Sequence, residues 1–349
     1  MKNPDLRILR YEIPKSLDGI RVGAFLREKG YSRHILSHLK RTNLPDCCGI
    51  TRNGEHIFTT HRLSGGDLLE VRLLETDESE YVPESPLPID MIYEDEDIQL
   101  IQKPAGLPVH PSKGHFGDSL GNALCYYAHH SLGKEKFIYR VINRLDRDTS
   151  GLLICAKNML AAGVLGAALT AREIRREYLA ICCGNPMETL ERGLPAVSAA
   201  PFPSLSEAHD AAKSTAPGLR ISAPLLDQGD VAMKRCVDFE RGIRAVSFLQ
   251  LLEYDSARDL SLIRLRLETG RTHQIRVHML YLGHPLPGDF LYHPNFRYIS
   301  RQALHSHALR FRHPINGQTL CFEAPLPADM RNLFPHYREH HAVPAARMV

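Results

Sequence analysis

The sequence reads Asn143-Arg144-Leu145-Asp146-Arg147-Asp148-Thr149-Ser150-Gly151 and then continues into the apolar residues 152–155. An apolar run that follows a polar turn predicts a buried strand. The turn itself holds two carboxylates, two guanidiniums and two hydroxyls within eight residues. A neighbouring guanidinium stabilises the ionised form that a nucleophilic carboxylate needs. The residues alone fit a salt-bridged turn as well as a catalytic site around Asp146.

Hydrophobic periodicity predicts further elements on both sides of this turn. Strands are expected at residues 98–102, 152–155 and 261–267, and helices at residues 119–131, 159–173 and 273–282. Strands and helices do not alternate regularly enough for a doubly wound parallel sheet. We therefore predict an α+β core around a mixed sheet. Residues 186–243 are rich in Pro, Ala and Ser with weak periodicity, and we interpret them as a variable insertion.

The distribution of charge divides the chain, although the net charge is only +3. Residues 1–73 hold 13 Lys and Arg against 8 Asp and Glu, whereas residues 75–97 hold ten acidic residues and no basic one. Prolines in the acidic stretch disfavour helix and strand interiors. We predict a module at residues 1–75, a linker at 76–90, a catalytic domain at 91–335 and a tail at 336–349. The tail, with His336, His340 and His341, is expected to be solvated.

The first 75 residues show helical spacing with basic residues on the outer face. These basic residues are Arg21, Arg27, Lys29, Arg33, Lys40 and Arg41. Asn53-Gly54 suits a tight hairpin turn, and a strand is expected at residues 68–73. A basic helical face contacts RNA phosphates in some modules and is only a solvated surface in others. Both readings stay open on the residues alone.

A second polar cluster, residues 268–278, follows the predicted strand 261–267 and enters a helix. Arg271, Thr272, His273 and Gln274 would present donors at the amino terminus of that helix, where phosphates and carboxylates are stabilised. An ordinary capped surface helix would show the same pattern.

Several classes of protein are disfavoured. There is no run of about 18 apolar residues, and the first residues lack the apolar core of a secretion signal, so a cytoplasmic location and no membrane contact are expected. The eight cysteines include no Cys-x-x-Cys pair, and the histidines show no His-Glu-x-x-His pattern. We expect no metal site.

Six motifs in a fixed order resemble the pseudouridine synthases of the large ribosomal RNA type, the RluA family. They are residues 101–111, 144–153, 176–180, 269–278, 283–289 and 301–305, with 311–314 following. The resemblance implies a mixed, mostly antiparallel sheet flanked by helices. It also implies a small α/β RNA-binding module at the amino terminus, similar to the one named after the ribosomal protein S4.

The resemblance implies roles for three residues far apart in sequence. Asp146 matches the catalytic aspartate, Tyr178 a tyrosine that packs against the target base, and Arg276 the basic partner of the aspartate. Arg271 is the second candidate for that partner. Whether the carboxylate attacks the sugar, assists its deprotonation or adds to the base stays open. The uridine must leave its stack, and Arg144 would hold the vacated space.

RNA is the expected partner, with ribosomal RNA ahead of transfer RNA, and no cofactor, no protein partner and a monomer are expected. The residues expected to contact the substrate RNA are Arg144, Arg147, Thr149, Arg271, Thr272, His273, Gln274, Lys103 and His305. Arg144 as a structural ion pair and Lys103 as part of a turn are the alternatives. Asn143 stands where the family usually has His. An inactive RNA-binding protein on the same fold and a metal-dependent hydrolase are the competing functions.

Overall fold

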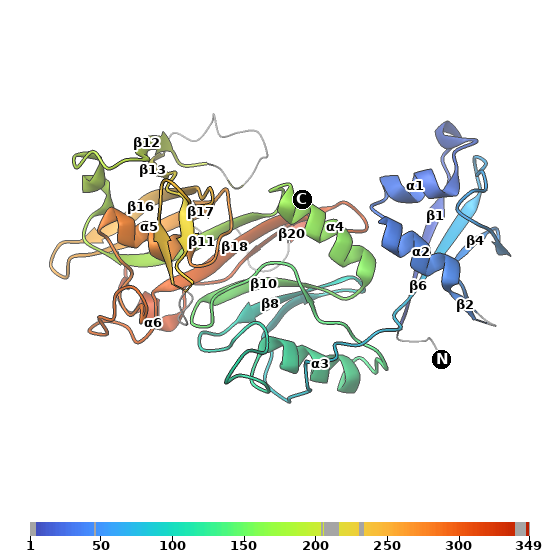
Figure 1. The fold of residues 1–349 in the computed structure, drawn as a ribbon, viewed down its shortest axis with the longest axis horizontal. Helices are drawn as coiled ribbons and strands as arrows, with labels where there is room; N and C mark the ends of the chain where they lie inside the picture. The colour runs from blue at the N-terminus through green and yellow to red at the C-terminus, as the bar shows by residue number, and fades with distance from the viewer. Residues whose placement is uncertain are drawn as a thin grey trace.

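The amino-terminal part of the chain forms a small α/β module. The structure is a computed structural model that describes residues 5–44, 47–203, 205, 216–229, 234–338 and 347–348. Four strands of the module form a sheet of order β1-β6-β4-β5, and two helices cover it (Figure 1). Its elements are β1 (Leu6–Glu12), the 3-10 helix η1 (Lys15–Leu17), α1 (Val22–Glu28), α2 (Arg33–Arg41), β2 (Asn43–Leu44), β3 (Cys47–Cys48), β4 (Ile50–Arg52), β5 (Glu55–His56) and β6 (Leu68–Leu74).

Helix α2 begins where Ser32 caps it and separates an apolar face from a basic one. The Ser32 hydroxyl accepts a hydrogen bond from the Ile35 amide (3.2 Å), which satisfies one of the free donors of the first turn. Ile35 is buried, whereas Arg33 and Lys40 are exposed. The two basic helices predicted from the sequence are confirmed. The predicted hairpin turn at residues 53–54 joins β4 to β5, with positive φ at both positions.

Beyond residue 90 the chain builds one large sheet. Its main path is β12-β13-β16-β17-β11-β18-β10-β8-β7, and among the described strand pairs only β10 and β18 run parallel. The strands of this sheet are β7 (Met91–Glu94), β8 (Ile98–Lys103), β9 (Arg140–Val141), β10 (Ser150–Ala156), β11 (Arg175–Cys183), β12 (Val197–Pro201), β13 (Pro217–Ile221), β16 (Ser247–Asp255), β17 (Leu260–Leu267), β18 (Leu304–Arg312), β19 (Thr319–Glu323) and β20 (Arg347–Met348). A separate two-stranded sheet consists of β14 (Leu225–Asp227) and β15 (Arg235–Val237). The predicted α+β class is confirmed.

Helices flank this sheet, and three of them lie at the predicted places, residues 119–131, 159–173 and 273–282. The helices are α3 (Leu120–His130), α4 (Met159–Thr170), the 3-10 helix η2 (Pro186–Leu190), α5 (Gln274–Leu282) and α6 (Ala328–Arg331). Leu124 of α3 and Met279 of α5 belong to the same buried cluster, together with apolar side chains of the sheet. Within the described ranges, no helix is both long and apolar enough to cross a membrane.

The parallel pair of β10 and β18 is a close seam in the middle of the sheet. Ser150 lies opposite His305, and Gly151 lies opposite Ser306. Gly151 has a φ of +112°, and a Cβ atom there would collide with the Ser306 carbonyl group. Only glycine suits both constraints. The seam therefore fixes where the 143–149 loop leaves the sheet.

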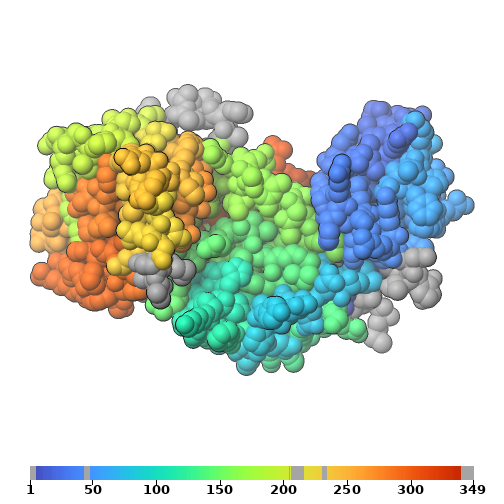
Figure 2. All heavy atoms as spheres, in the orientation of Figure 1, coloured from blue at the N-terminus to red at the C-terminus, as the bar shows by residue number. Residues whose placement is uncertain are grey.

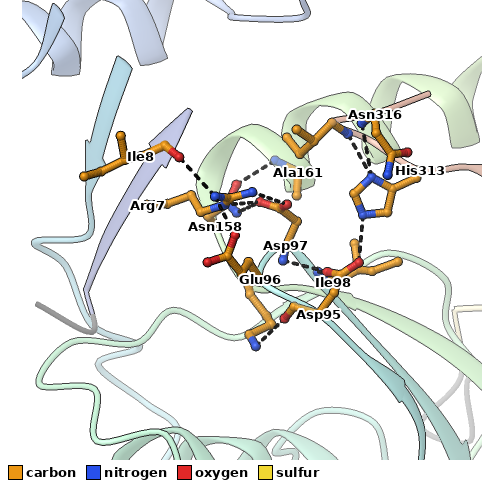
Figure 3. Close-up of polar contacts among 12 residues, drawn as sticks. Arg7, Ile8, Asp95, Glu96, Asp97, Ile98, Asn158, Ala161, His313 and Asn316 are labelled. Atoms are coloured by element: carbon orange, nitrogen blue, oxygen red, sulfur yellow. Dashed lines mark hydrogen bonds and ion pairs between the residues drawn. The ribbon is translucent and has the colours of Figure 1, made fainter. Parts of the chain in front are cut away.

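The module is docked on the large sheet through helix α4. Met159, Leu160 and Val164 of α4 pack into the apolar core of the module. Figure 3 shows the polar side of this junction, where Arg7 of β1 donates two hydrogen bonds to Asp97 (2.9 and 2.8 Å). In Figure 2 the module forms a lobe of its own at the right of the molecule. Apolar contact and ion pairs thus join the two parts.

The segment predicted as a linker, residues 76–90, contains no helix or strand, and it lies against α3. The Asn122 side chain donates a hydrogen bond to the Pro83 carbonyl (2.6 Å), and the backbone carbonyl of Asn122 accepts one from the Ser85 amide (3.1 Å). The carboxylate of Glu84 is hydrogen-bonded to the imidazole rings of His129 and His130, at 2.6 and 2.7 Å. The segment is therefore held by hydrogen bonds against α3.

Two regions for which the sequence predicted no regular element contain strands in the described residues. Residues 186–243 supply β12 and β13, which extend the main sheet, and the hairpin β14–β15. Ladder pairing stabilises these strands where periodicity gave no signal. In the predicted tail, β20 pairs with β19, and His336 is exposed. His340 and His341 lie outside the described residues.

Candidate active site

The polar loop before β10 is held on the sheet by Asn143. Its side chain donates to the Leu152 carbonyl (3.3 Å) and accepts from the Ile154 amide (2.9 Å). The loop closes on itself where the Thr149 amide donates to the Asp146 carbonyl (3.1 Å). Asn143 thus anchors the backbone that carries Asp146, and it does so from a buried position.

Arg276 on α5 joins Asp146 to a second carboxylate, Asp289. The Nε and Nη2 atoms of Arg276 each donate to Asp289 at 2.7 Å, and Nη1 donates to Asp146 at 2.9 Å. A bidentate pair of this kind fixes the plane of the guanidinium. Asp289 therefore aims the remaining donor of Arg276 at Asp146.

The three charges differ in their access to water. Only 2% of the Arg276 side chain is exposed, whereas 26% of the Asp146 side chain is exposed. Burial by itself would lower the pKa of Arg276, but the hydrogen bonds and charges of Asp289 and Asp146 outweigh it and raise that pKa. A permanent cation therefore lies beside a carboxylate that a ligand can reach.

Tyr178 on β11 lies in the same pocket. The register of β11 against β18 shifts between Glu177 and Tyr178, because β18 has one additional residue, His307, at this point. Tyr178 is buried, and burial raises the pKa of its hydroxyl, with the charge of Asp146 acting in the same direction. The phenol is therefore protonated at neutral pH, so Tyr178 does not carry the free phenolate that a general base would need before the reaction begins.

His273 begins helix α5 in the left-handed conformation, with a φ of 57°. Its Nδ1 atom lies 2.9 Å from the Tyr292 hydroxyl, and its Nε2 atom lies 3.9 Å from Asp146. Burial lowers the pKa of His273, although the charge of Asp146 opposes that shift. A neutral imidazole therefore faces the carboxylate.

The pocket around Asp146 brings together most of the residues expected at the site. It is lined by Arg144, Leu145, Asp146, Thr149, Tyr178, Leu267, Arg271, His273, Gln274, Ile275, Arg276 and Leu304. Arg144 is exposed at its edge. Arg147 and Thr272 are not among the lining residues, and Arg147 is paired with its neighbour Asp148 (2.9 Å).

Lys103 does not reach the surface, which argues against the predicted contact with RNA. It is fully buried, and its ammonium group donates to the carbonyls of Pro104, Leu107 and Arg147 at 2.8, 2.8 and 2.7 Å. Burial lowers the pKa of Lys103 to about 7. The alternative role of Lys103, as part of a turn, fits the structure, because these hydrogen bonds order the loop beside Asp146.

The burial of His305 and Gln274 argues against the predicted contacts with RNA, although Gln274 is one of the residues that line the pocket. His305 lies in the seam, where its Nδ1 atom is 2.9 Å from the Ser150 hydroxyl. Gln274 is buried, and its amide donates to the Val246 carbonyl (3.0 Å) while its oxygen accepts from the Thr269 hydroxyl (2.8 Å). The polar atoms of both side chains are therefore hydrogen-bonded within the protein.

The sequence reasoning missed Asp289 and the aromatic residues after it. Asp289 lay in a motif that carried the family resemblance, but no role followed from its position alone. The guanidinium carbon of Arg276 lies 5.0 Å from the ring centre of Tyr292 and 5.8 Å from that of Phe290. The available signal in the sequence was the carboxylate of Asp289, which directly follows Gly288 and comes soon after the helix that bears Arg276.

A separate cluster of potential metal ligands lies at the module junction. Oxygen and nitrogen atoms of Asp95, Asp97 and His313 lie within 4.8 Å of one another. Asp95 already accepts from His313 (2.9 Å) and from two backbone amides, and Asp97 accepts from Arg7. These bonds occupy the oxygens that a cation would need.

The arrangement around Asp146 can act on a bound ring, with a reachable carboxylate, a fixed counter-charge and a tyrosine in one pocket. Such a set suits nucleophilic or acid–base chemistry. Residues 97–281, more than half of the chain, match the family model described as RNA pseudouridylate synthase.

Similar proteins agree with that match. The chain is 34% identical to a protein named Uncharacterized RNA pseudouridine synthase YjbO from Bacillus subtilis over 312 residues, which are 89% of this chain and 97% of that one. It is also 34% identical to Ribosomal large subunit pseudouridine synthase D from Haemophilus ducreyi, over 93% of both chains. Human RNA Pseudouridylate Synthase Domain Containing 1 shares the fold at 22% identity, with a TM-score of 0.50 over 75% of this chain and 98% of that chain.

The chain therefore belongs to the RNA pseudouridylate synthase family, in its RluA branch. It is an isomerase that acts on RNA, and the family resemblance inferred from the motifs is confirmed. The inactive alternative and the metal-dependent hydrolase are not supported.

Proposed function

We propose that Asp146 is the catalytic carboxylate with which this enzyme isomerises uridines of large-subunit ribosomal RNA. The observation that carries the proposal is the 2.9 Å bond from Arg276 to Asp146, with Tyr178 in the same pocket. Relatives such as the Haemophilus ducreyi protein are named for the large ribosomal subunit, which supports the choice of RNA.

The surrounding residues have separate tasks in this proposal. Arg276 keeps Asp146 anionic and fixes its rotamer, because Asp289 holds the guanidinium. Tyr178 presents its ring to the uracil. The uridine is flipped out of its stack, at a cost of a few kcal/mol, and exposed Arg144 holds the space that it leaves.

The amino-terminal module is proposed to be S4-like and to bind RNA phosphates. A groove between α1 and α2 is lined by Arg21, Arg27, Arg33 and Lys40. Backbone phosphates of RNA are bound by clustered cations of this kind. Two other basic residues are not among those that line the groove: Lys29 lies over the Phe25 ring (5.6 Å), and Arg41 donates to Ser37 at the edge of the groove (3.2 Å).

The test is to replace Asp146 and map pseudouridine in ribosomal and transfer RNA from cells that carry only the variant gene. Asp146→Asn should abolish the sites that depend on this gene, with a rate loss of more than about a thousandfold for a removed catalytic group. The matched control is Asp148→Asn, two residues away, which should keep them. Sites that persist with Asp146→Asn would overturn the catalytic assignment. Sites confined to transfer RNA would overturn the choice of RNA.

A further inference from the structure

Phe290 lies beside the site and is half exposed. The exposed fraction of this residue is 49%. The guanidinium carbons of Arg147 and Arg276 lie 5.6 and 5.8 Å from the centre of its ring. Arg276 is bonded to Asp146 and lines the pocket that holds the carboxylate, so the ring lies next to a residue of that pocket.

The backbone that carries Phe290 is braced on both sides. Asp289 accepts from the amides of Leu291 and Tyr292 at 3.1 and 3.2 Å, and the His293 amide donates to the Asp289 carbonyl at 2.8 Å. The carboxylate that fixes Arg276 therefore also fixes the turn that presents Phe290. A backbone held in this way loses little conformational freedom when the ring that it carries binds a ligand.

Covering Arg276 does not account for the position of the ring. Arg276 is already buried, and the ring of Tyr292 lies closer to it, at 5.0 Å. About half of the surface of Phe290 remains open to solvent, beside the exposed side chain of Arg147. An exposed aromatic ring next to an exposed guanidinium is the kind of surface on which unstacked RNA bases rest.

We propose that Phe290 is a stacking platform for a base adjacent to the flipped uridine, and that Arg147 supports the same nucleotide. This role rests on the proposed function of Asp146. A uridine that leaves its stack deprives its neighbour of a stacking partner, and Phe290 replaces that partner. The platform therefore acts on binding of RNA and not on the isomerisation step.

The test compares Phe290→Leu with Phe290→Trp. The control is Phe296→Leu, because Phe296 is 51% exposed and lies six residues further along the chain. The probe is total RNA labelled with [5-³H]uridine, purified from cells that lack this gene, and the readout is tritium released when C5 forms its new bond. Phe290→Leu should raise KM about tenfold, within the range of one base–aromatic stack, and should leave kcat within about twofold. Phe290→Trp should retain the KM of the unmodified enzyme.

Each outcome separates this role from the proposed function. A lower kcat with unchanged KM in Phe290→Leu would show that the ring serves Arg276 instead, and unchanged constants would also overturn the platform. In both cases an inert Asp146→Asn enzyme would leave the catalytic assignment standing. Release of no tritium by the unmodified enzyme would overturn both proposals together.

Discussion

Two arginine–aspartate clusters in this molecule use the same pair for different purposes. At the proposed active site, Arg276 is bidentate to Asp289 with both bonds at 2.7 Å. At the module junction, Arg7 is bidentate to Asp97 with bonds of 2.9 and 2.8 Å (Figure 3). The pairs are alike in geometry, and their difference lies in what the remaining donors and acceptors meet.

The third partner decides the use of each pair. The spare donor of Arg276 meets Asp146, which faces a pocket. The corresponding donor of Arg7 meets Glu96, whose side chain is exposed (2.7 Å). A bidentate pair therefore joins two parts of the chain when its third donor meets an exposed side chain, and it positions a carboxylate when that donor points into a pocket.

The largest effect is expected from Asp289→Asn, which breaks the pair at the site. Removing one partner of a buried ion pair costs about 3–5 kcal/mol, because the other charge is left buried. Urea unfolding should show this loss, and kcat should fall because Arg276 is no longer aimed at Asp146. The control is Asp329→Asn, where Arg301 keeps backbone acceptors and Asp329 is half exposed, so about 1 kcal/mol or less is expected. Equal losses in the two variants would contradict the comparison.

A smaller effect is expected from Arg7→Gln at the junction. Because Arg7 is partly exposed, the pair should contribute about 1 kcal/mol. The coupling energy is measured by a double-mutant cycle with Asp97→Asn, followed by urea unfolding. The value of kcat should not change, since neither residue lines the pocket around Asp146. Additive single losses would mean that the pair does not clamp the junction.

Acid should weaken the seam beside the site through His305. Burial lowers the pKa of His305 to about 3, whereas an unfolded histidine titrates near 6.5. Between these values the unfolded chain binds a proton that the folded chain does not, so stability is present above pH 6.5 and falls as the pH drops. From pH 7 to pH 5 the contribution is about 2 kcal/mol. His305→Asn should show a correspondingly smaller drop in urea unfolding than the unmodified protein, whereas the exposed-site variant His336→Asn should not.

The smallest structural effect is expected from the basic groove of the module. Arg27→Gln and Arg33→Gln should each weaken RNA binding and reduce the slope of log affinity against log salt by about 0.7–0.9. Folding and kcat should stay unchanged. The control is Arg10→Gln, because Arg10 belongs to the module and is paired with Glu70 outside the groove. An unchanged slope in both groove variants would argue against phosphate contacts there.

Substitutions are preferable to removal of residues 1–75. Deletion was the obvious experiment for a module joined by a linker. It would expose Leu160, Met159 and Val164, which pack into the module core. Loss of activity would then report exposed apolar surface as well as lost RNA contacts.

Much of the fold followed from local patterns. Alternation predicted β17, apolar runs predicted β8 and β10, and the spacing of basic and apolar residues predicted α1 and α2. The strands β12 and β13 escaped, because their stability comes from ladder partners that periodicity does not encode. Local pattern therefore sufficed for elements that carry their own amphipathic signal.

The site was predictable as a set of residues and less so as a geometry. Motifs singled out Asp146, Tyr178 and Arg276, and the structure places them around one pocket. Burial could not be read from the same motifs, so Lys103 and His305 were assigned to the RNA although both are inside the protein. The position of a polar residue in a motif shows that it matters, but its surroundings decide for what.

The pairing of β10 with β18 also determines when this part of the sheet can form during translation. Ser150 and His305 meet across 155 positions of the chain. At about 5–20 residues per second, a ribosome needs on the order of ten seconds to supply the second strand after the first. Until then the loop that carries Asp146 has no neighbour on that side. The pocket around Asp146, which Leu304 also lines, is therefore completed only when most of the polypeptide has been translated.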